Sequence, residues 1–463
     1  MTICFVTPEF ITEKKNFDGG LSNYLFRVAL SLQHMGHTAI IVVASDVTEV
    51  FFYEKIEVHR VKVPFTLSPY YIQCCLQSFI LNNYIRSLVL KKIIDIIQYS
   101  NYTFTSLYRI LTIPTVCRIS SYEKYLDEYY NQTDLNNESI KKYELEKFCL
   151  LSTDAVFGPS TIIANAIKND LKIDSIEIIE TPFYNDVKQT DEFVYSENLQ
   201  NCKYFLFFGT IGILKGIKTI AAIIDELLEK NPNFLFVFVG KQTDIEGQTA
   251  MEYVRCMAPM HFNRIKHFGA LNHDQLYPII SHAEICVFPS RIDNFPNCCI
   301  EAMAHKKIVI GTKNTGFDQL ITHGVNGFLC ERDNPLALLQ TIENVLQLRS
   351  TEKEIIENNA YARIQLLTPE RVVTQLVDFY EATIKRFDIQ KATKCSFQTQ
   401  MDVQQILFDS MLQQKRYNES VIKAKDTIIQ KKEESFNEIV HSKTYRLGNI
   451  FLSPFRKIMN IKF

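Results

Sequence analysis

The spacing of hydrophobic residues in the first fifty positions predicts a strand, a helix and a second strand. The apolar run ICFVTPEF comes first, and after a glycine-containing loop the segment LSNYLFRVALSLQHMGH repeats apolar residues at helical spacing. The apolar face of this predicted helix consists of Leu21, Leu25, Val28, Ala29 and Leu32. The run TAIIVVASD follows as a second buried strand. This order indicates a βαβ unit with parallel strands.

The same alternation continues and then starts again after a polar stretch. The apolar runs KIEVHRVKVP, DIIQYS, PTVCRIS, DAVFGPS and SIEIIETP alternate with helical segments to about residue 190. After NDVKQTDEFVYSENLQNCK, a second series runs from YFLFFGTIGILKG to GFLCE. We therefore expect an α/β protein with two doubly wound domains, over residues 1–195 and 200–368, and a helix over 369–388 that closes the second domain. Ligands of such sheets bind beyond the carboxyl ends of the strands, so we expect the chemistry in the cleft between the domains.

Composition narrows the class of protein. With 463 residues and a formal charge of −2, the chain gives no general electrostatic reason to bind nucleic acid. Its twelve cysteines form no CxxC pair and its ten histidines show no HExxH spacing, so we expect free thiols and no bound metal. The first residues lack a basic, apolar leader, and the sequence has no run of eighteen apolar residues. We therefore expect a cytoplasmic protein.

The segment FFGTIGILKGIKTI has the features of an anion site. A strand is followed by Gly209 and Gly212 in a turn, then by Lys215, and Gly216 stands where a helix begins. Exposed amides and a helix N-terminus attract anions, and the lysine adds a full positive charge. In isolation, a surface lysine beside a turn explains the pattern equally well.

The segment SRIDNFPNCCIEAMA places two carboxylates around the start of a predicted helix. Amides of Asn297, Cys298 and Cys299 are candidates to bind a phosphate or a sugar hydroxyl. Glu301, one turn into the helix, can accept two hydrogen bonds from a vicinal diol such as ribose, and Asp293 can hold a hydroxyl at the other end of the same ligand. The alternative is a loop acid followed by an ordinary acid that the helix dipole favours.

Taken in order, the motifs of the chain resemble those of the retaining glycosyltransferases of family 4, which have the GT-B fold. They are Gly19-Gly20 in the first loop, GTIGILKG, FVFVGK, HFGAL and SRIDNFPNCCIEAMAHKKIVIGTKNTGFDQLITHGVNGFL. The resemblance covers roughly residues 1–386. It implies two Rossmann-like domains facing a central cleft, a nucleoside-diphosphate sugar as donor substrate, a glycan or lipid-linked acceptor, and no cofactor.

The resemblance also implies roles for individual residues. Glu301 would bind the nucleotide ribose, Asp293 would contact the donor sugar, and Lys215 would neutralise the leaving diphosphate. Gly19 and Gly20 would let the N-terminal loop approach the donor. The other residues that we assign to the donor site are Gly209, Thr210, Gly240, Phe268, Asn297 and Cys298.

The chain departs from the family pattern at several positions, the first of the two acids among them, where an aspartate replaces the usual glutamate. Thr210 stands where many members have an arginine, and Ser120, Ser121 and Tyr122 stand where many have a histidine nearby. A glutamate often found after the NTG motif is Gln319. These departures favour an alternative in which the chain is a non-catalytic partner or scaffold of a polysaccharide assembly complex. A sugar-nucleotide epimerase with the GT-B fold is a further alternative.

The C-terminal residues have a different composition. Residues 391–441 lack glycine and proline and read as a helical tail, a candidate for self-association as a coiled coil or else an extended, solvated helix. Residues 442–463 have no acid, and their basic residues are Lys443, Arg446, Arg456, Lys457 and Lys462. A basic, amphipathic segment is typical of a membrane surface, and this one also resembles, more weakly, the C-terminal segments of bacterial surface-polysaccharide glycosyltransferases. We expect peripheral binding at the inner face of the membrane, the alternative being a helix docked on the domains.

Overall fold

The computed structural model describes residues 1–11, 20–67, 69–125, 137–184, 190–388, 423, 425, 427, 430–435 and 437. The chain divides into two compact units, residues 1–400 and 401–463. The described positions of the second unit are helical and exposed. Gly19, the segment 442–463 and most of the predicted tail over 391–441 lie outside the described residues, and the predictions made for them stand as predictions.

The first half of the large unit is built on a parallel sheet. Its strands are β1 (Thr2–Thr7), β2 (Thr38–Ser45), β3 (Glu49–Tyr53), β4 (Ile56–Lys62), β5 (Ile96–Ser100), β6 (Thr115–Arg118), β7 (Ala155–Gly158) and β8 (Glu177–Ile178). They lie in the order β3-β4-β2-β1-β5-β6-β7-β8, and only the β3–β4 pair is antiparallel. The order reverses at β1, which lies between β2 and β5. Such a reversal places a ligand crevice at the carboxyl end of β1.

Helices cover the two faces of this sheet, because strands that are apolar along their whole length must be buried on both sides. They are α1 (Gly20–His34), α2 (Tyr70–Val89), η1 (Tyr102–Phe104), α4 (Asn137–Ser152) and α5 (Thr161–Leu171). The predicted apolar face of α1 is buried at Leu25, Val28 and Leu32. The helix ends just before Gly36, whose φ of 83° is the left-handed conformation that a glycine adopts without strain.

The second half repeats the arrangement. Its parallel sheet consists of β9 (Lys203–Phe208), β10 (Phe234–Val239), β13 (Ile265–Phe268), β14 (Ile285–Val287), β15 (Val309–Thr312) and β16 (Phe328–Cys330). The order is β13-β10-β9-β14-β15-β16, so the reversal falls between β9 and β14. The two short strands β11 (Asp244–Ile245) and β12 (Gln248–Thr249) form a separate hairpin. Phe205, Phe207, Phe236 and Phe238 are buried in the core of the sheet, where their large apolar rings contribute much of the burial.

The helices of the second half surround this sheet. They are α6 (Phe193–Leu199), η2 (Ile213–Lys215), α7 (Ile217–Ala221), α8 (Ile224–Lys230), α9 (Ala250–Met257), η3 (Phe262–Arg264), α10 (His273–His282), α11 (Asn297–Ala304), α12 (Phe317–Leu320), α13 (Pro335–Leu346), α14 (Ser350–Ile364) and η4 (Gln365–Leu367). The prediction of an α/β protein with two doubly wound sheets is confirmed. Within the residues that the structure describes, no helix combines the length and the apolar character needed to span a membrane.

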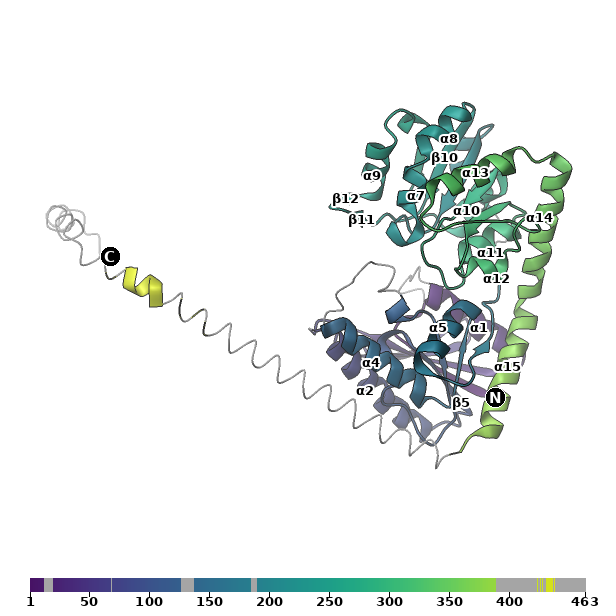
Figure 1. Ribbon diagram of the computed structural model, residues 1–463. Helices are drawn as coiled ribbons and strands as arrows, with labels where there is room; N and C mark the ends of the chain where they lie inside the picture. The colour runs from purple at the N-terminus through teal and green to yellow at the C-terminus, as the bar shows by residue number, and fades with distance from the viewer. Residues whose placement is uncertain are drawn as a thin grey trace, which may run out of the picture. The chain divides into compact units, whose positions relative to one another are not determined.

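The helix expected to close the second domain belongs instead to the core of the first. α15 (Pro369–Arg386) follows η4 and lies beside α1 (Figure 1), and it also contacts β6. Its apolar face, formed by Val372, Val373, Leu376, Val377 and Tyr380, is buried in the same cluster as β1, β2 and α1. The hydroxyl of Tyr380 donates a hydrogen bond to the side chain of Gln98 on β5. The amphipathic pattern predicted the helix correctly but did not specify which sheet would receive it.

Candidate active site

The carboxyl ends of β9, β10 and β13 bring four of the predicted donor-site residues to one edge of the second sheet. Gly209 N–H donates to the carbonyl of Val239 at 2.9 Å, and Gly240 N–H donates to the carbonyl of Phe268 at 3.0 Å. Gly240 has a φ of 140°, and a Cβ there would lie 1.9 Å from the Gly209 oxygen. Only glycine fits this approach. Thr210 follows at the exposed surface of the same edge.

Lys215 is brought to this edge by a tight turn. It is the last residue of η2, and Gly216, with a φ of 80°, ends that helix and begins α7. A Cβ on Gly216 would lie 1.9 Å from the carbonyl oxygen of Pro289, so the turn packs directly on the loop that follows β14. Arg291 N–H also donates to the carbonyl of Leu214 at 2.9 Å. The turn that carries Lys215 is therefore packed against, and hydrogen-bonded to, the loop that follows β14.

The two predicted catalytic residues contact each other here. The ammonium of Lys215 lies 2.6 Å from Oδ2 of Asp293, and the lysine side chain is 36% exposed while that of the aspartate is 11% exposed. Burial lowers the pKa of Lys215, but the adjacent Asp293 carboxylate more than offsets this and the pKa lies above its ordinary value. Lys215 is therefore a permanent positive charge at neutral pH.

The helix α11 begins directly after this loop and carries the other predicted residues of the motif. The Cys299 amide, one of three expected to point at a ligand, donates instead to the carbonyl of Pro296 at 3.1 Å. Burial, followed by the charge of Asp293, raises the pKa of the Cys298 thiol well above its ordinary value. The thiol is thus protonated and is a poor nucleophile.

Glu301 on α11 faces the first half of the chain across a small cavity. Gly20 at the start of α1, Asn297 and Glu301 all line it, and a Cβ on Gly20 would lie 3.7 Å from Nδ2 of Asn297. Its volume of about 70 Å³ is far below the roughly 300 Å³ of a typical ligand pocket. The two halves therefore lie close together around Glu301.

Two basic residues in this cavity escaped the sequence analysis. His273, at the start of α10, places Nε2 3.6 Å from Oε1 of Glu301, and Arg27 on α1 also lines the cavity. The only signal in the sequence was the position of His273 directly after the HFGALN segment. Neither residue belongs to a motif, so spacing alone did not identify them.

On the first half, the loop over residues 120–123 carries Ser120, Ser121 and Tyr122, where the sequence departs from the pattern that the resemblance predicts. Glu146 on α4 is buried beneath it and accepts hydrogen bonds from Asn101 Nδ2 at 2.7 Å and from Glu123 N–H at 2.8 Å. The side-chain oxygen of Asn101 also accepts the Ser120 N–H at 2.8 Å. Burial is the main cause that raises the pKa of Glu146, to about 8. A carboxyl that is largely protonated at neutral pH thus supports the loop from below.

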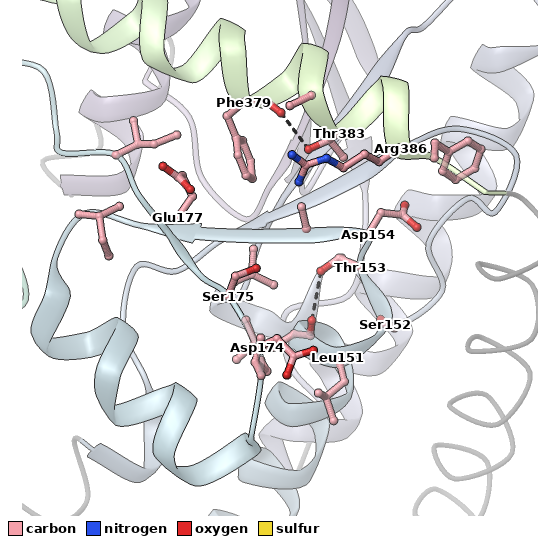
Figure 2. A pocket seen from close by; sticks show the side chains of 18 of the residues that line it. Leu151, Ser152, Thr153, Asp154, Asp174, Ser175, Glu177, Phe379, Thr383 and Arg386 are labelled. Atoms are coloured by element: carbon pink, nitrogen blue, oxygen red, sulfur yellow. Dashed lines mark hydrogen bonds between the residues drawn. The ribbon is translucent and has the colours of Figure 1, made fainter.

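A much larger pocket lies elsewhere in the first half. It has a volume of about 910 Å³ and is formed by the residues before β7, the loop before β8 and the end of α15 (Figure 2). Asp154, Asp174, Glu177 and Arg386 line it. This is the amino end of β7, the opposite edge of the sheet from the predicted chemistry, so the pocket is not part of the candidate site. In the described part of the chain, no group of three or more His, Cys, Asp or Glu residues is placed to hold a metal ion.

Family models match both halves of the chain. A model described as Glycosyltransferase Family 4 matches residues 18–183, and one described as Glycosyl transferases group 1 matches residues 189–362. The chain belongs to the family 4 glycosyltransferases. The two matched regions meet between residues 183 and 189, close to the domain boundary that the hydrophobic pattern predicted.

Known relatives of this glycosyltransferase chain are distant. An uncharacterized glycosyltransferase of Methanocaldococcus jannaschii is 26% identical over 220 residues, which is 48% of this chain and 57% of that protein. The capsular polysaccharide biosynthesis glycosyltransferase CapM of Staphylococcus aureus is 22% identical over 274 residues, 55% of this chain and 70% of CapM. The match therefore spans little more than half the length of the archaeal relative.

Solved structures establish the fold. Sucrose-phosphate synthase from Thermosynechococcus elongatus aligns with a TM-score of 0.69 at 17% identity, over 83% of this chain and 100% of that structure. HepE from Anabaena, solved in complex with UDP, aligns with a TM-score of 0.63 at 16% identity, over 82% of this chain and 100% of HepE. The predicted GT-B fold is confirmed.

Proposed function

We propose that the chain transfers a sugar from a nucleoside-diphosphate donor, with retention of configuration, to a glycan or lipid-linked acceptor in bacterial surface polysaccharide biosynthesis. The observation that carries this proposal is the Lys215–Asp293 pair, 2.6 Å apart at the carboxyl ends of the strands and directly before α11. The HepE structures that contain UDP or UDP-glucose support the donor class, and the name of CapM supports the polysaccharide context.

In the proposed reaction, the bond between the sugar and the diphosphate breaks towards an oxocarbenium-like state while negative charge collects on the diphosphate. The ammonium of Lys215 would exchange Asp293 for the diphosphate, and this exchange would free the carboxylate to hold a sugar hydroxyl. Glu301 would accept hydrogen bonds from the ribose. Catalysis then comes from positioning and from charge stabilisation, which suits a site whose cysteine is protonated.

The test is incubation of the full chain with a panel of UDP-, GDP- and dTDP-sugars and lipid extracts as acceptors, followed by NMR of the product anomer. A product that keeps the donor's anomeric configuration supports the proposal. A new sugar nucleotide formed without acceptor would indicate the epimerase, and an inverted product would overturn retention. Failure to bind any sugar nucleotide would leave the scaffold alternative.

A further inference from the structure

Two side-chain amides of the second half hold the same turn of the first half. Asn294, the residue after Asp293, accepts a hydrogen bond from the buried Ser160 hydroxyl and donates from Nδ2 to the carbonyl of Ser120 at 3.0 Å. The side chain of Asn294 is therefore hydrogen-bonded both to the turn after β7 and to the loop over residues 120–123.

Gln319 on α12 binds the adjacent residues of that turn. Its Oε1 accepts the N–H of Thr161 at 2.8 Å, and its Nε2 donates to the carbonyl of Pro159 at 3.1 Å. α12 is in turn fixed to the catalytic loop, because Gly316 N–H donates to the carbonyl of Asp293 at 2.7 Å. The hydrogen bonds of Gln319 to the first half therefore come from a segment that is itself bonded to the loop of Asp293.

These contacts complete the N-terminus of α5. The first amides of a helix have no partner within the helix and are usually satisfied by the side chain of the N-cap residue. Ser160 occupies the N-cap position with extended backbone, yet its side chain makes no cap hydrogen bond because it is engaged by Asn294. The Thr161 amide is instead satisfied by Gln319 from the other half.

The amide of Gln319 serves the contact both as an acceptor and as a donor. Nε2 of Gln319 also donates to Oε1 of Glu180 at 2.7 Å, and the same oxygen receives Arg363 Nη2 at 2.6 Å. A carboxylate at position 319 would keep the bond from Thr161 but would have no proton to offer Glu180 or Pro159. The charged groups around position 319 are Glu180, Arg363, whose Nη2 also donates to the Gln319 carbonyl, and Asp318, which accepts the Asn314 N–H.

We propose that Asn294 and Gln319 form a latch that holds the two halves closed on each other in the ligand-free chain, and that the uncharged amide of residue 319 supplies both the donor and the acceptor on which the latch depends. They are positioning residues that act through the Asp293 loop. The role in catalysis rests on the proposed function, but closure itself is a property of the chain without ligand. At position 319, the departure from the family pattern thus has a structural purpose.

The test is Gln319→Glu, measured by amide hydrogen exchange on the ligand-free chain and expressed as protection factors at pH 8 and pH 5. At pH 8 we expect the protection of the Thr161 amide to fall roughly tenfold relative to wild type, which corresponds to the net loss of about one hydrogen bond. At pH 5, close to the ordinary pKa of a glutamate, part of the new carboxyl population is protonated and regains a donor, so protection should rise partly towards the wild-type value. Gln347→Glu adds the same charge at an exposed position of the same half and should change nothing at Thr161.

A second variant separates the latch from general damage. Glu180→Gln combined with Gln319→Glu exchanges acid and amide across the contact and should restore protection at pH 8. Two results would overturn the latch. One is a Thr161 protection factor in Gln319→Glu at pH 8 equal to that of wild type. The other is a protection factor that neither low pH nor the double variant with Glu180→Gln restores. Binding of UDP, measured in parallel by calorimetry, tests the proposed function separately. If wild type does not bind UDP, the hydrogen-exchange result for Thr161 still decides whether the latch exists.

Discussion

At the scale of single residues, Glu146 makes the stability of the first half depend on pH. Its pKa is about 8 in the folded chain because of burial, well above that of an exposed glutamate. Between about pH 4.5 and pH 8 the folded state retains a proton that the unfolded state releases, so stability falls as pH rises, by up to about 1.4 kcal/mol per pH unit. Glu146→Gln removes the titrating group and should flatten the dependence of the melting temperature on pH. Glu144→Gln, on a more exposed face of α4, should leave the slope of melting temperature against pH as in wild type.

Lys215 provides the sharpest test of the proposed chemistry. Lys215→Ala removes the charge that would stabilise the leaving diphosphate, and turnover should fall by ~10²–10³ with a smaller change in donor affinity. Lys218, three residues on, is half-buried like Lys215 but pairs with Glu246 instead of Asp293, so Lys218→Ala is the matched control. Equal losses in both variants, measured by release of nucleoside diphosphate, would mean that Lys215 has no special role.

Glu301 should act on binding more than on turnover. Glu301→Ala removes the charged acceptor proposed for the ribose hydroxyls, and donor affinity should weaken by roughly 1.5–3 kcal/mol in calorimetry. The comparison is with Glu301→Gln, which keeps the shape and part of the hydrogen bonding of the side chain and should lose less. Unchanged affinity in both variants would remove Glu301 from the donor site.

Motif spacing predicted the residues of the candidate site but not their contacts. Asp293 and Glu301 were predicted because they flank the start of a helix within one short segment, and Lys215 because it follows a strand and two glycines. The 2.6 Å contact between Lys215 and Asp293 joins residues 78 positions apart and depends on the packing of Gly216 against Pro289. Long-range contacts of this kind leave no periodic trace in the sequence.

At the scale of elements, hydrophobic periodicity predicted the main strands and helices well, since strands buried on both faces and amphipathic helices have distinct patterns. It failed for the destination of α15, because an apolar face specifies burial and not a partner. Leu376, 1% exposed in the first core, makes this destination testable. Leu376→Ala should lower the free energy of unfolding by about 2–5 kcal/mol in urea. In the Leu376→Ala variant, the rate of amide hydrogen exchange should rise in β1 and not in β9. Gln375→Ala, at an exposed position, should leave the exchange rates of both strands unchanged.

At the scale of the whole molecule, the expected membrane contact of residues 442–463 is independent of the donor site. The apolar residues would enter the headgroup boundary, and each basic residue near an anionic surface adds about 1 kcal/mol of attraction. Binding to anionic vesicles should weaken as salt rises, and deletion of residues 442–463 should abolish it while sugar-nucleotide binding persists. Aggregation or unfolding of the shortened chain would show instead that this segment covers the domains.

The return of α15 to the first sheet also sets an order of events on the ribosome. The core around Ile3 and Phe5 lacks its last cover until Leu376 and Tyr380 have been synthesised. At roughly 5–20 residues per second, the second half takes on the order of tens of seconds to be made. During that interval the N-terminal half is an unfinished domain, although it was translated first. The half that emerges last can therefore complete its own core before this part of the first half is covered.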